Sequence, residues 1–169
     1  MLCFSVSSVA GSTGEIDLTV VVTWVVDGDT IDVASGETIR LADIDTPEKD
    51  TPGYSEATQF MIDLVKGKQV YLDVDDITRT DSSGQRLVCV VYVDYNSTHY
   101  ENVNKALLEG GYAVVWDHDN NEFEPSNWSL YVLKATIPEF PAVSLLAVIV
   151  VIVLLAALLC RKRQIKKHD

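Results

Sequence analysis

Residues 18–48 read LTVVVTWVVDGDTIDVASGETIRLADIDTPE, and this stretch decides the fold. Three runs rich in Val, Ile and Thr alternate with two polar breaks, Asp27-Gly28-Asp29 and Ser35-Gly36. β-Branched side chains favour extended backbone, whereas Gly, Ser and Asp favour turns. The stretch therefore predicts three short antiparallel strands, at 18–26, 30–33 and 38–44.

The chain beyond this stretch adds helices and two further strands. Apolar residues at helical spacing over 55–66, with Ser55 as the N-cap and Gly67 as the stop, predict a helix. Five short strands with an inserted helix and trailing helices are typical of a small, partly open barrel. We therefore expect an α+β domain over 15–134. Its other predicted elements are strands at 69–74 and 87–94 and helices at 103–108 and 127–133.

The most apolar part of the sequence lies near its C-terminus. Residues 142–160 are apolar except for Ser144, and a helix of this length spans about 28 Å, close to the hydrocarbon thickness of a bilayer. A buried helix of a soluble domain is the alternative, but such a helix has a polar face and this run has none. The run predicts a transmembrane helix, preceded at 135–141 by a Pro-containing linker that is not helical throughout.

Charge predicts the orientation of this helix. The tail 161–169 holds five basic residues, and basic flanks mark the cytoplasmic side of a membrane. Residues 1–134 hold eight Lys and Arg against 23 Asp and Glu, a formal charge of −15, and are expected outside the cytoplasm. A cytoplasmic domain on a tail-anchored protein is the alternative, but it requires moving five positive charges outward. The mildly apolar residues 1–14 are interpreted as a signal-peptide remnant or a misassigned start.

The residues that can carry chemistry lie at the ends of the predicted strands. Asp29 leaves a glycine turn and Asp45 ends a strand, so a hairpin would bring together two carboxylates that suit a hard divalent cation. Arg40 precedes Asp45 on the same strand and can approach a phosphate, and Glu48 can accept a proton from an attacking water. Taken singly, each residue is typical of a turn or a solvated strand. Together they supply what a phosphodiester hydrolase needs.

These residues belong to blocks that resemble a known family. Asp27-Gly28-Asp29-Thr30, Arg40-Leu41, Asp45-Thr46-Pro47-Glu48 and Arg79-Thr80-Asp81-Ser82-Ser83-Gly84 are similar to the signature blocks of the staphylococcal nuclease (thermonuclease) family. The resemblance, over about 19–116, implies a five-stranded OB-fold barrel with two to three helices and a Ca²⁺-dependent nuclease acting on DNA and RNA. It also implies Asp29, Asp45 and the Thr46 carbonyl as Ca²⁺ ligands, Glu48 as general base and Arg40 as the phosphate-binding residue.

Departures from the family pattern affect the same site. Family members commonly have an arginine directly after the turn glycine, whereas here Gly84 is followed by Gln85 and then Arg86. One position along a strand reverses the face of a side chain, so either Arg86 reaches the site through a bulge or Gln85 stands there and activity falls. Ser83 and Asp117 stand where the family has aromatic residues, so weak base stacking is expected. The alternative to a nuclease is a catalytically impaired OB-fold module that binds at the cell surface.

The tail resembles a second signature. Pro138-Glu139-Phe140, the apolar run and the basic cluster are similar to the PEF-type C-terminal sorting signal of archaeal surface proteins. That resemblance implies membrane lipid and an archaeosortase as partners, with cleavage near the motif and transfer to a lipid anchor. A plain transmembrane anchor has the same span and charges.

The negative charge of the domain also bears on its substrate. An acidic domain repels nucleic acid, so binding is expected to depend strongly on cations. Nothing in the sequence predicts an oligomer.

Overall fold

The computed structural model describes residues 15–116 and 120–134. The predicted signal-peptide remnant at 1–14, the linker at 135–141, the membrane helix at 142–160 and the basic tail at 161–169 lie outside the described residues. Within those ranges, no helix is long and apolar enough to cross a membrane.

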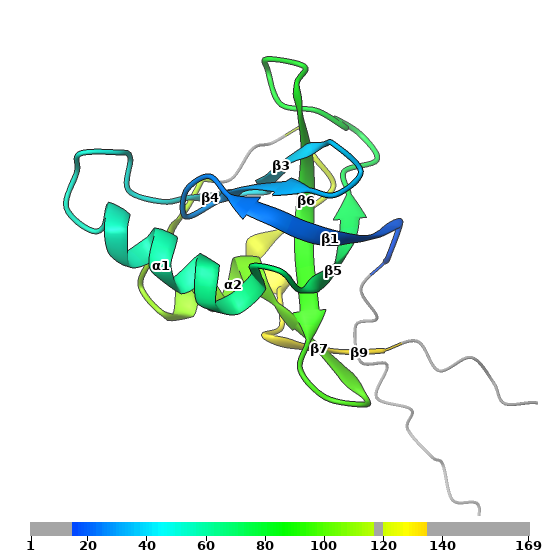
Figure 1. The fold of residues 1–169 in the computed structure, drawn as a ribbon. Helices are drawn as coiled ribbons and strands as arrows, with labels where there is room; N and C mark the ends of the chain where they lie inside the picture. The colour runs from blue at the N-terminus through cyan, green and yellow to red at the C-terminus, as the bar shows by residue number, and fades with distance from the viewer. Residues whose placement is uncertain (1–14, 117–119, 135–169) are drawn as a thin grey trace, which may run out of the picture. The chain divides into compact units, whose positions relative to one another are not determined.

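The described elements follow one another as strands with two inserted α-helices (Figure 1). The helices are α1 (Tyr54–Val65) and α2 (Val103–Glu109), and a single 3₁₀ turn covers Pro125–Asn127. The strands are β1 (Leu18–Val25), β2 (Thr30–Val33), β3 (Thr38–Leu41), β4 (Ile44–Asp45), β5 (Gln69–Val74), β6 (Arg86–Asp94), β7 (His99–Asn102), β8 (Val114–Val115) and β9 (Tyr131–Leu133).

Five of these strands close into a barrel, as predicted. β1 pairs antiparallel with β2 and β5, β2 pairs with β3, and β5 pairs with β6. The barrel closes where β3 pairs in parallel with β6, which sets Arg40 opposite Val88. β7 and β9 extend the sheet beyond β6, and β4 with β8 forms a separate two-stranded sheet. The five-stranded barrel with two helices confirms the α+β fold.

The third predicted helix, at 127–133, is wrong. The chain makes its 3₁₀ turn at Pro125–Asn127 and then runs as β9, with Tyr131 opposite Glu101 of β7. Tyr131 and Leu133 are exposed and Val132 between them is buried, which is the alternation of a strand at a sheet edge. Tertiary pairing with β7 therefore overrides any local helical tendency.

Two element boundaries also differ from prediction. The strand expected at 38–44 is broken between β3 and β4, because Asp43 adopts a left-handed backbone with φ of 52°. Asp tolerates this conformation better than most residues since its short side chain bonds locally. α1 begins at Tyr54 with Gly53 at the N-cap rather than Ser55, and Gly67 follows its end as predicted.

The barrel interior is apolar, and polar residues that alternate with the buried ones point outward. Ile39 and Leu41 of β3 are buried in the core, which also holds Met61 of α1 and Leu107 of α2. Alternation along β3 therefore places Arg40 on the outer face of the barrel. Burial of the flanking residues fixes this register, since a one-residue slip would turn the guanidinium into the core.

A buried amide attaches α2 to the barrel beside the site. Asn104 Oδ1 accepts a hydrogen bond from the Val91 amide at 3.0 Å, and its Nδ2 donates to the Ala42 carbonyl at 3.0 Å and the Cys89 carbonyl at 3.4 Å. The side chain thus joins α2 to β6 and to the turn between β3 and β4. That turn precedes Asp45, so Asn104 supports one side of the predicted site.

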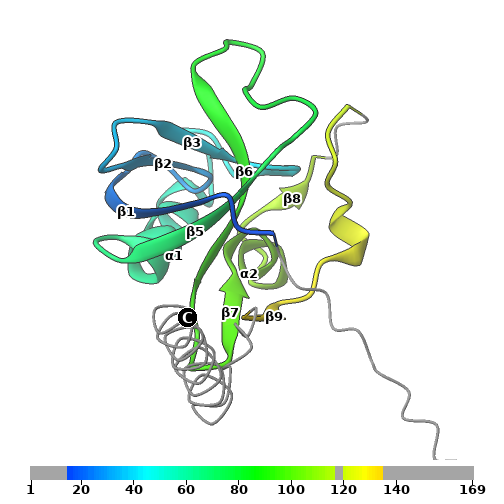
Figure 2. The ribbon, with the colours of Figure 1, turned by 90° about the vertical axis from the view of Figure 1, so that its right-hand side faces the viewer.

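The outer face of β5 and β6 carries a second apolar cluster. Val90, Tyr92 and Val132 are buried in it, and Phe123 and Trp128 pack against it. In the view of Figure 2, the segment 120–134, drawn in yellow, lies on the opposite side of β6 from α1. This segment therefore covers an outer face that the barrel would otherwise expose to solvent.

An acidic group beside this cluster has an unusual protonation equilibrium. Partial burial of Asp73 on β5, followed by the charges of Glu122, Asp17 and Glu15, raises the pKa of its carboxyl from 3.8 to about 7. Between about pH 4 and pH 7 the Asp73 carboxyl therefore stays protonated in the folded chain, whereas it is ionised in the unfolded chain. Stability falls as the pH rises through that window and stays lower above it.

Replacing Asp73 by Asn is expected to remove this pH dependence. An amide at this position cannot ionise, so the variant should exceed the wild type in unfolding free energy by about 1 kcal/mol at pH 8, after allowance for solvent screening, and match it near pH 4. Urea unfolding at both pH values measures the difference. Asp63→Asn, at an exposed position of α1, is the matched control and should show no such change. Equal effects of Asp73→Asn at both pH values would contradict the assignment.

Candidate active site

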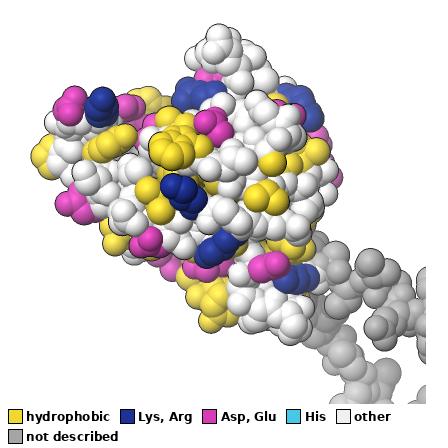
Figure 3. Space-filling view, viewed as in Figure 1, with side chains coloured by type: hydrophobic (Ala, Val, Ile, Leu, Met, Phe, Trp, Pro, Cys, Tyr) yellow, Lys and Arg dark blue, Asp and Glu magenta, His cyan; other side chains and the backbone are white. Residues whose placement is uncertain are grey.

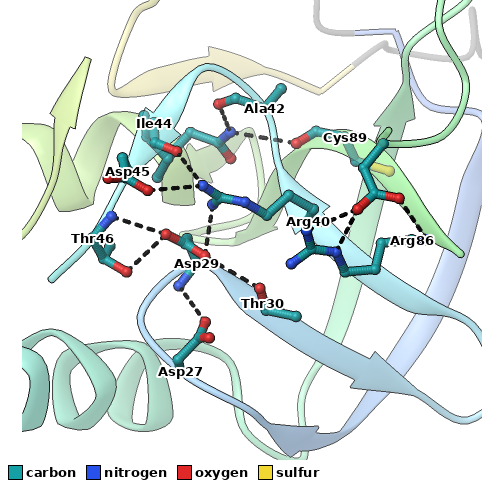
Figure 4. A network of polar contacts seen from close by, with 12 residues as sticks. Asp27, Asp29, Thr30, Arg40, Ala42, Ile44, Asp45, Thr46, Arg86 and Cys89 are labelled. Atoms are coloured by element: carbon teal, nitrogen blue, oxygen red, sulfur yellow. Dashed lines mark hydrogen bonds and ion pairs between the residues drawn. The ribbon is translucent and has the colours of Figure 1, made fainter. Parts of the chain in front are cut away.

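Asp29 is held rigidly at the turn between β1 and β2. The residue is buried, with 6% of its surface exposed. Its Oδ2 accepts hydrogen bonds from the Thr46 amide at 2.9 Å and the Thr46 hydroxyl at 2.8 Å, and its Oδ1 accepts one from the Thr30 hydroxyl at 3.2 Å (Figure 4). These bonds join the turn before β2 to the segment after β4.

The guanidinium of Arg40 joins the two predicted carboxylate ligands. Its Nη1 contacts Asp29 Oδ1 at 2.6 Å, a charge contact rather than an aligned hydrogen bond, and its Nη2 donates to Asp45 Oδ1 at 3.2 Å and to the Ile44 carbonyl at 2.9 Å. Figure 4 shows the side chain reaching from β3 toward both carboxylates. The structure therefore brings Asp29, Arg40, Asp45 and Thr46 together. The guanidinium neutralises two carboxylates that would otherwise repel each other.

A third carboxylate belongs to the same network. Burial of Asp27 and the negative charge of Asp29 raise the pKa of the Asp27 carboxyl above its usual value. A hydrogen bond from the Asp29 amide to Asp27 Oδ1, at 3.1 Å, and the charge of Arg40 act in the opposite direction. Asp27 thus shapes the turn that presents Asp29 and adds negative potential beside it.

Within the described residues, Glu48 makes no side-chain hydrogen bond or ion pair with this network and is open to solvent. It follows Pro47 at the start of the loop that leads from β4 to α1, and it is exposed. Its carbonyl accepts hydrogen bonds from the amide and hydroxyl of Thr51, which fix the backbone of the loop. The carboxylate is therefore free of the ion pairs that hold Asp29 and Asp45, and water has access to it.

Arg86 is the first residue of β6, and a carboxylate positions it. Its Nε and Nη2 both contact Asp81 Oδ2 at 2.8 Å. Burial by itself raises the pKa of Asp81, but hydrogen bonds from the Ser83 hydroxyl and from Arg86 outweigh it and lower that pKa to about 2. Asp81 is therefore ionised at neutral pH and holds the Arg86 guanidinium.

A cavity of about 390 Å³ connects the two arginines. Arg40 and Arg86 both line it, whereas Gln85 is exposed and does not. Of the two residues that the sequence offered for the place of the family arginine, Arg86 lines this cavity and Gln85 does not. The remaining lining comes from the turn after β3, the loop between β5 and β6, and the segment after β8, including Asp43, Asp75, Thr78, Trp116 and Asn121.

Gly28 is required by close packing in the turn that carries Asp29. A Cβ at this position would lie 2.8 Å from the Thr46 hydroxyl oxygen and 2.9 Å from the Ala57 Cβ. Thr46 is buried and bonded to Asp29, so it has no room to withdraw. Even one methyl group therefore disturbs the contact between the turn and the segment after β4.

The substitution Gly28→Ala is expected to lower the unfolding free energy by about 1–3 kcal/mol, as overpacking of a tight site does. Urea unfolding measures the loss. Gly36→Ala separates this effect from backbone strain. A Cβ at Gly36 meets no atom within 4 Å, so the φ of 104° is the source of any loss there. A Gly28→Ala variant as stable as the wild type would show that the turn moves freely.

Comparison with known families assigns a large part of the chain to one of them. The family model described as staphylococcal nuclease homologue matches residues 38–134. The chain belongs to the staphylococcal nuclease family. The match includes Arg40, Asp45, Glu48 and Arg86 and begins after Asp29. Membership supports a nuclease or a nucleic-acid-binding function. No curated protein matches the chain.

The donors beside Arg40 fit the Ca²⁺ that staphylococcal nucleases typically use. Asp29 and Asp45 converge on one cationic group in this structure, so their carboxylates are already arranged around a positive charge. Within the described ranges, no cluster of three or more Asp, Glu, His or Cys residues is suited to a metal. Asp29 and Asp45 alone would leave most positions of a Ca²⁺ ion to other oxygens.

The face of the molecule drawn in Figure 3 has no basic patch of the kind that attracts nucleic acid. On this face, Lys and Arg side chains are scattered among Asp and Glu, without a continuous basic stripe.

The sequence analysis named Asp29, Arg40 and Asp45, which the structure brings together, but it did not identify Asp81 as the residue that holds Arg86. The five-residue separation of Asp81 and Arg86 across a glycine turn is the signal that could have found it.

Proposed function

We propose that this chain is a membrane-tethered, Ca²⁺-dependent nuclease that hydrolyses phosphodiester bonds of DNA or RNA outside the cytoplasm. One observation carries the proposal. Two guanidinium groups from separate strands, Arg40 of β3 and Arg86 of β6, line one cavity, and Arg40 contacts a convergent pair of carboxylates. Paired arginines and hard oxygen donors at one point are what hydrolysis of a phosphodiester requires.

The arginines bind and orient the substrate. A guanidinium presents its N–H groups in a fork that matches two phosphate oxygens, and it stays charged at every accessible pH. Asp81 holds Arg86, so this side chain is oriented before substrate binds and needs little reorganisation as negative charge develops in the transition state. Arg40 must leave Asp29 before that carboxylate can hold Ca²⁺, which frees its guanidinium for the phosphate.

Glu48 supplies the proton acceptor. A water oxygen attacks phosphorus as the bond to the leaving oxygen breaks, and the Glu48 carboxylate takes the proton of that water. Arg86 donates hydrogen bonds to the leaving oxygen, while Arg40 remains on the non-bridging oxygens. Asp29, Asp45 and the Thr46 carbonyl would hold Ca²⁺, which would supply polarisation of the phosphate and a lower pKa of the attacking water.

The proposed location follows from the sequence beyond the described domain. The apolar run 142–160 is long enough to span a bilayer, and the basic tail favours a domain outside the cytoplasm. A sorting signal at Pro138-Glu139-Phe140 would replace this span by a lipid anchor through an archaeosortase. Protease treatment of intact cells tests the location, since a protected domain contradicts it.

The activity is tested with the purified full chain and a fluorescent single-stranded oligonucleotide. Cleavage should appear at millimolar Ca²⁺, fall to background when the ion is chelated, and return when Ca²⁺ is restored. A salt titration belongs to the same experiment, because the charge of −15 over residues 1–134 makes binding sensitive to cations.

A folded chain that binds Ca²⁺ and cleaves neither DNA nor RNA would contradict the proposal. That outcome would favour the catalytically impaired binding module instead. The exposed Gln85, where the family commonly has an arginine, is the feature that such a result would implicate.

A further inference from the structure

The turn between β6 and β7 carries a sequence motif that the proposed nuclease does not use. Asn96-Ser97-Thr98 matches the N-glycosylation sequon Asn-X-Ser/Thr, in which X is any residue except Pro. All three residues are exposed, and so are Asp94 and Tyr95 before them. A modifying enzyme can therefore reach this sequon on the folded domain.

The side chain of Asn96 is held so that its amide nitrogen stays available. Its Oδ1 accepts hydrogen bonds from the Thr98 amide at 2.8 Å, the Thr98 hydroxyl at 3.0 Å and the His99 amide at 2.9 Å. In the part of the chain that the structure describes, Nδ2 donates to no protein acceptor. A sugar attached at Nδ2 leaves Oδ1 as an acceptor. The hydrogen bonds that shape the turn can therefore persist after modification.

The second sequon, Asn127-Trp128-Ser129, lies in a different environment. Its middle residue, Trp128, is partly buried and packs against both the barrel core and the outer apolar cluster. The Trp128 amide also donates to the Pro125 carbonyl at 3.3 Å. This segment cannot enter the site of an enzyme without loss of apolar packing. Of the two sequons, the one at Asn96 is therefore the better acceptor.

Exposed aromatic side chains stand beside the Asn96 turn. Tyr95 has 53% of its surface exposed and Tyr131 of β9 has 43%, and their ring centroids lie 4.3 Å apart. Leu133, on the same side of β9 as Tyr131, is exposed as well. Exposed apolar groups gathered at one place usually serve a contact. Sugar rings have C–H faces that pack on aromatic rings, so a glycan on the neighbouring Asn96 can cover this surface.

We propose that Asn96 carries an N-linked glycan. The inference goes beyond the activity of the site and rests on the location in the proposed function, because sequons are glycosylated in secreted proteins and domains. The donor is a sugar joined through phosphate or diphosphate to a membrane lipid. Asn96 Nδ2 bonds to the anomeric carbon of the sugar as the bond from that carbon to the phosphate oxygen breaks. The lipid phosphate leaves, and one Nδ2 proton passes to a base of the transferring enzyme, without oxidation or reduction.

A glycan at this position leaves the candidate active site open. Arg86 begins β6 and Asp94 ends it, so the strand separates the Asn96 turn from Arg86 by about 26 Å. Figure 1 shows this turn at the opposite end of β6 from the loop between β5 and β6, which contributes to the cavity. Loss of the glycan should therefore leave Ca²⁺-dependent cleavage unchanged.

The test is mass spectrometry of the full chain, purified from the membranes of the cells that naturally make it. Trypsin cleaves after Arg86, Lys105 and Lys134, so residues 87–105 and 106–134 form separate peptides with one sequon each. Peptide 87–105 should show a mass increase equal to whole sugar residues, which fragmentation locates on Asn96. Peptide 106–134 should have the mass of the unmodified sequence.

Variants of both sequons test the assignment further. Asn96→Gln and Thr98→Ala should lose the sugar completely, whereas Thr98→Ser keeps a hydroxyl and should keep the sugar. The matched control Asn127→Gln should also keep it. An unmodified Asn96 in the wild type would overturn the inference, and so would sugar on Asn127 alone. The wild type decides the matter if a variant does not fold.

The outcomes separate this inference from the nuclease. Sugar on Asn96 without cleavage of DNA or RNA would keep the inference and reject the nuclease. Cleavage by a chain that is unmodified at Asn96 would do the opposite. An unmodified chain whose domain is also protected from protease on intact cells would reject the proposed location together with the inference.

Discussion

Replacing Glu48 by Gln is expected to lower Ca²⁺-dependent cleavage about 10²- to 10⁴-fold, the usual contribution of a positioned general base. The glutamine amide keeps the size of the side chain but cannot take a proton from water. The carboxylate is exposed and belongs to no ion pair that holds Asp29 or Asp45, so the fold and the Ca²⁺ affinity should change little. Initial rates at saturating Ca²⁺ measure the effect.

The control for Glu48→Gln is a carboxylate nearby that has no place in the site. Glu56 is exposed in the first turn of α1, and Glu56→Gln removes the same charge from the domain. Its cleavage rate should stay within a factor of about two or three of wild type, on the order expected for a surface charge. Equal losses in the two variants would mean that Glu48 acts through overall charge alone. An unaffected Glu48→Gln rate would remove it from the mechanism.

Replacing Arg40 by Ala is expected to affect both stability and activity. Asp29 is buried and Asp45 partly buried, and the guanidinium separates their charges. Removing it leaves one carboxylate unpaired beside another and should lower the unfolding free energy by about 2–4 kcal/mol in Ca²⁺-free buffer. Cleavage should fall about 10²- to 10³-fold because a phosphate contact made in the transition state is lost.

Ca²⁺ should restore much of the lost stability in Arg40→Ala. Each oxygen of Asp29 already has two polar contacts, so a metal can reach Oδ1 only as Arg40 withdraws. The variant should therefore gain more stability from Ca²⁺ than the wild type does, by the linkage of binding to folding. Thermal unfolding at several Ca²⁺ concentrations measures this, with the exposed Arg79→Ala as control. Equal Ca²⁺ responses in wild type and variant would show that Arg40 does not compete with the metal.

Much of the barrel could be predicted where more and less buried residues alternate, as in β3 and β5. Ile39 and Leu41 point inward, and Arg40 between them points outward, as the pattern requires. β9 could not be found in the same way, because three residues are too few to show a period and their pairing with β7 is tertiary. The break at Asp43 was also hidden, since a left-handed residue leaves no pattern when its neighbours are apolar.

The sequence also allowed some residues of the site, but not others, to be placed. Asp29 and Asp45 flank turns in one continuous stretch, so their proximity, through Arg40, follows from local hairpins. Arg86 could not be placed from sequence, because its face depends on where β6 begins relative to the loop. The cavity between Arg40 and Arg86 carried no signal either, because it appears only when β3 and β6 are paired.

Closure of the barrel also determines when the two arginines meet during folding. β3 and β6 are neighbours only through the parallel pairing that completes the barrel, so a chain lacking β6 has no cavity between Arg40 and Arg86. Contacts between segments so distant in sequence form late and slowly in small β-rich domains. A partly synthesised chain would therefore lack the paired arginines on which the proposed hydrolysis depends, and would acquire them only when the whole domain had folded.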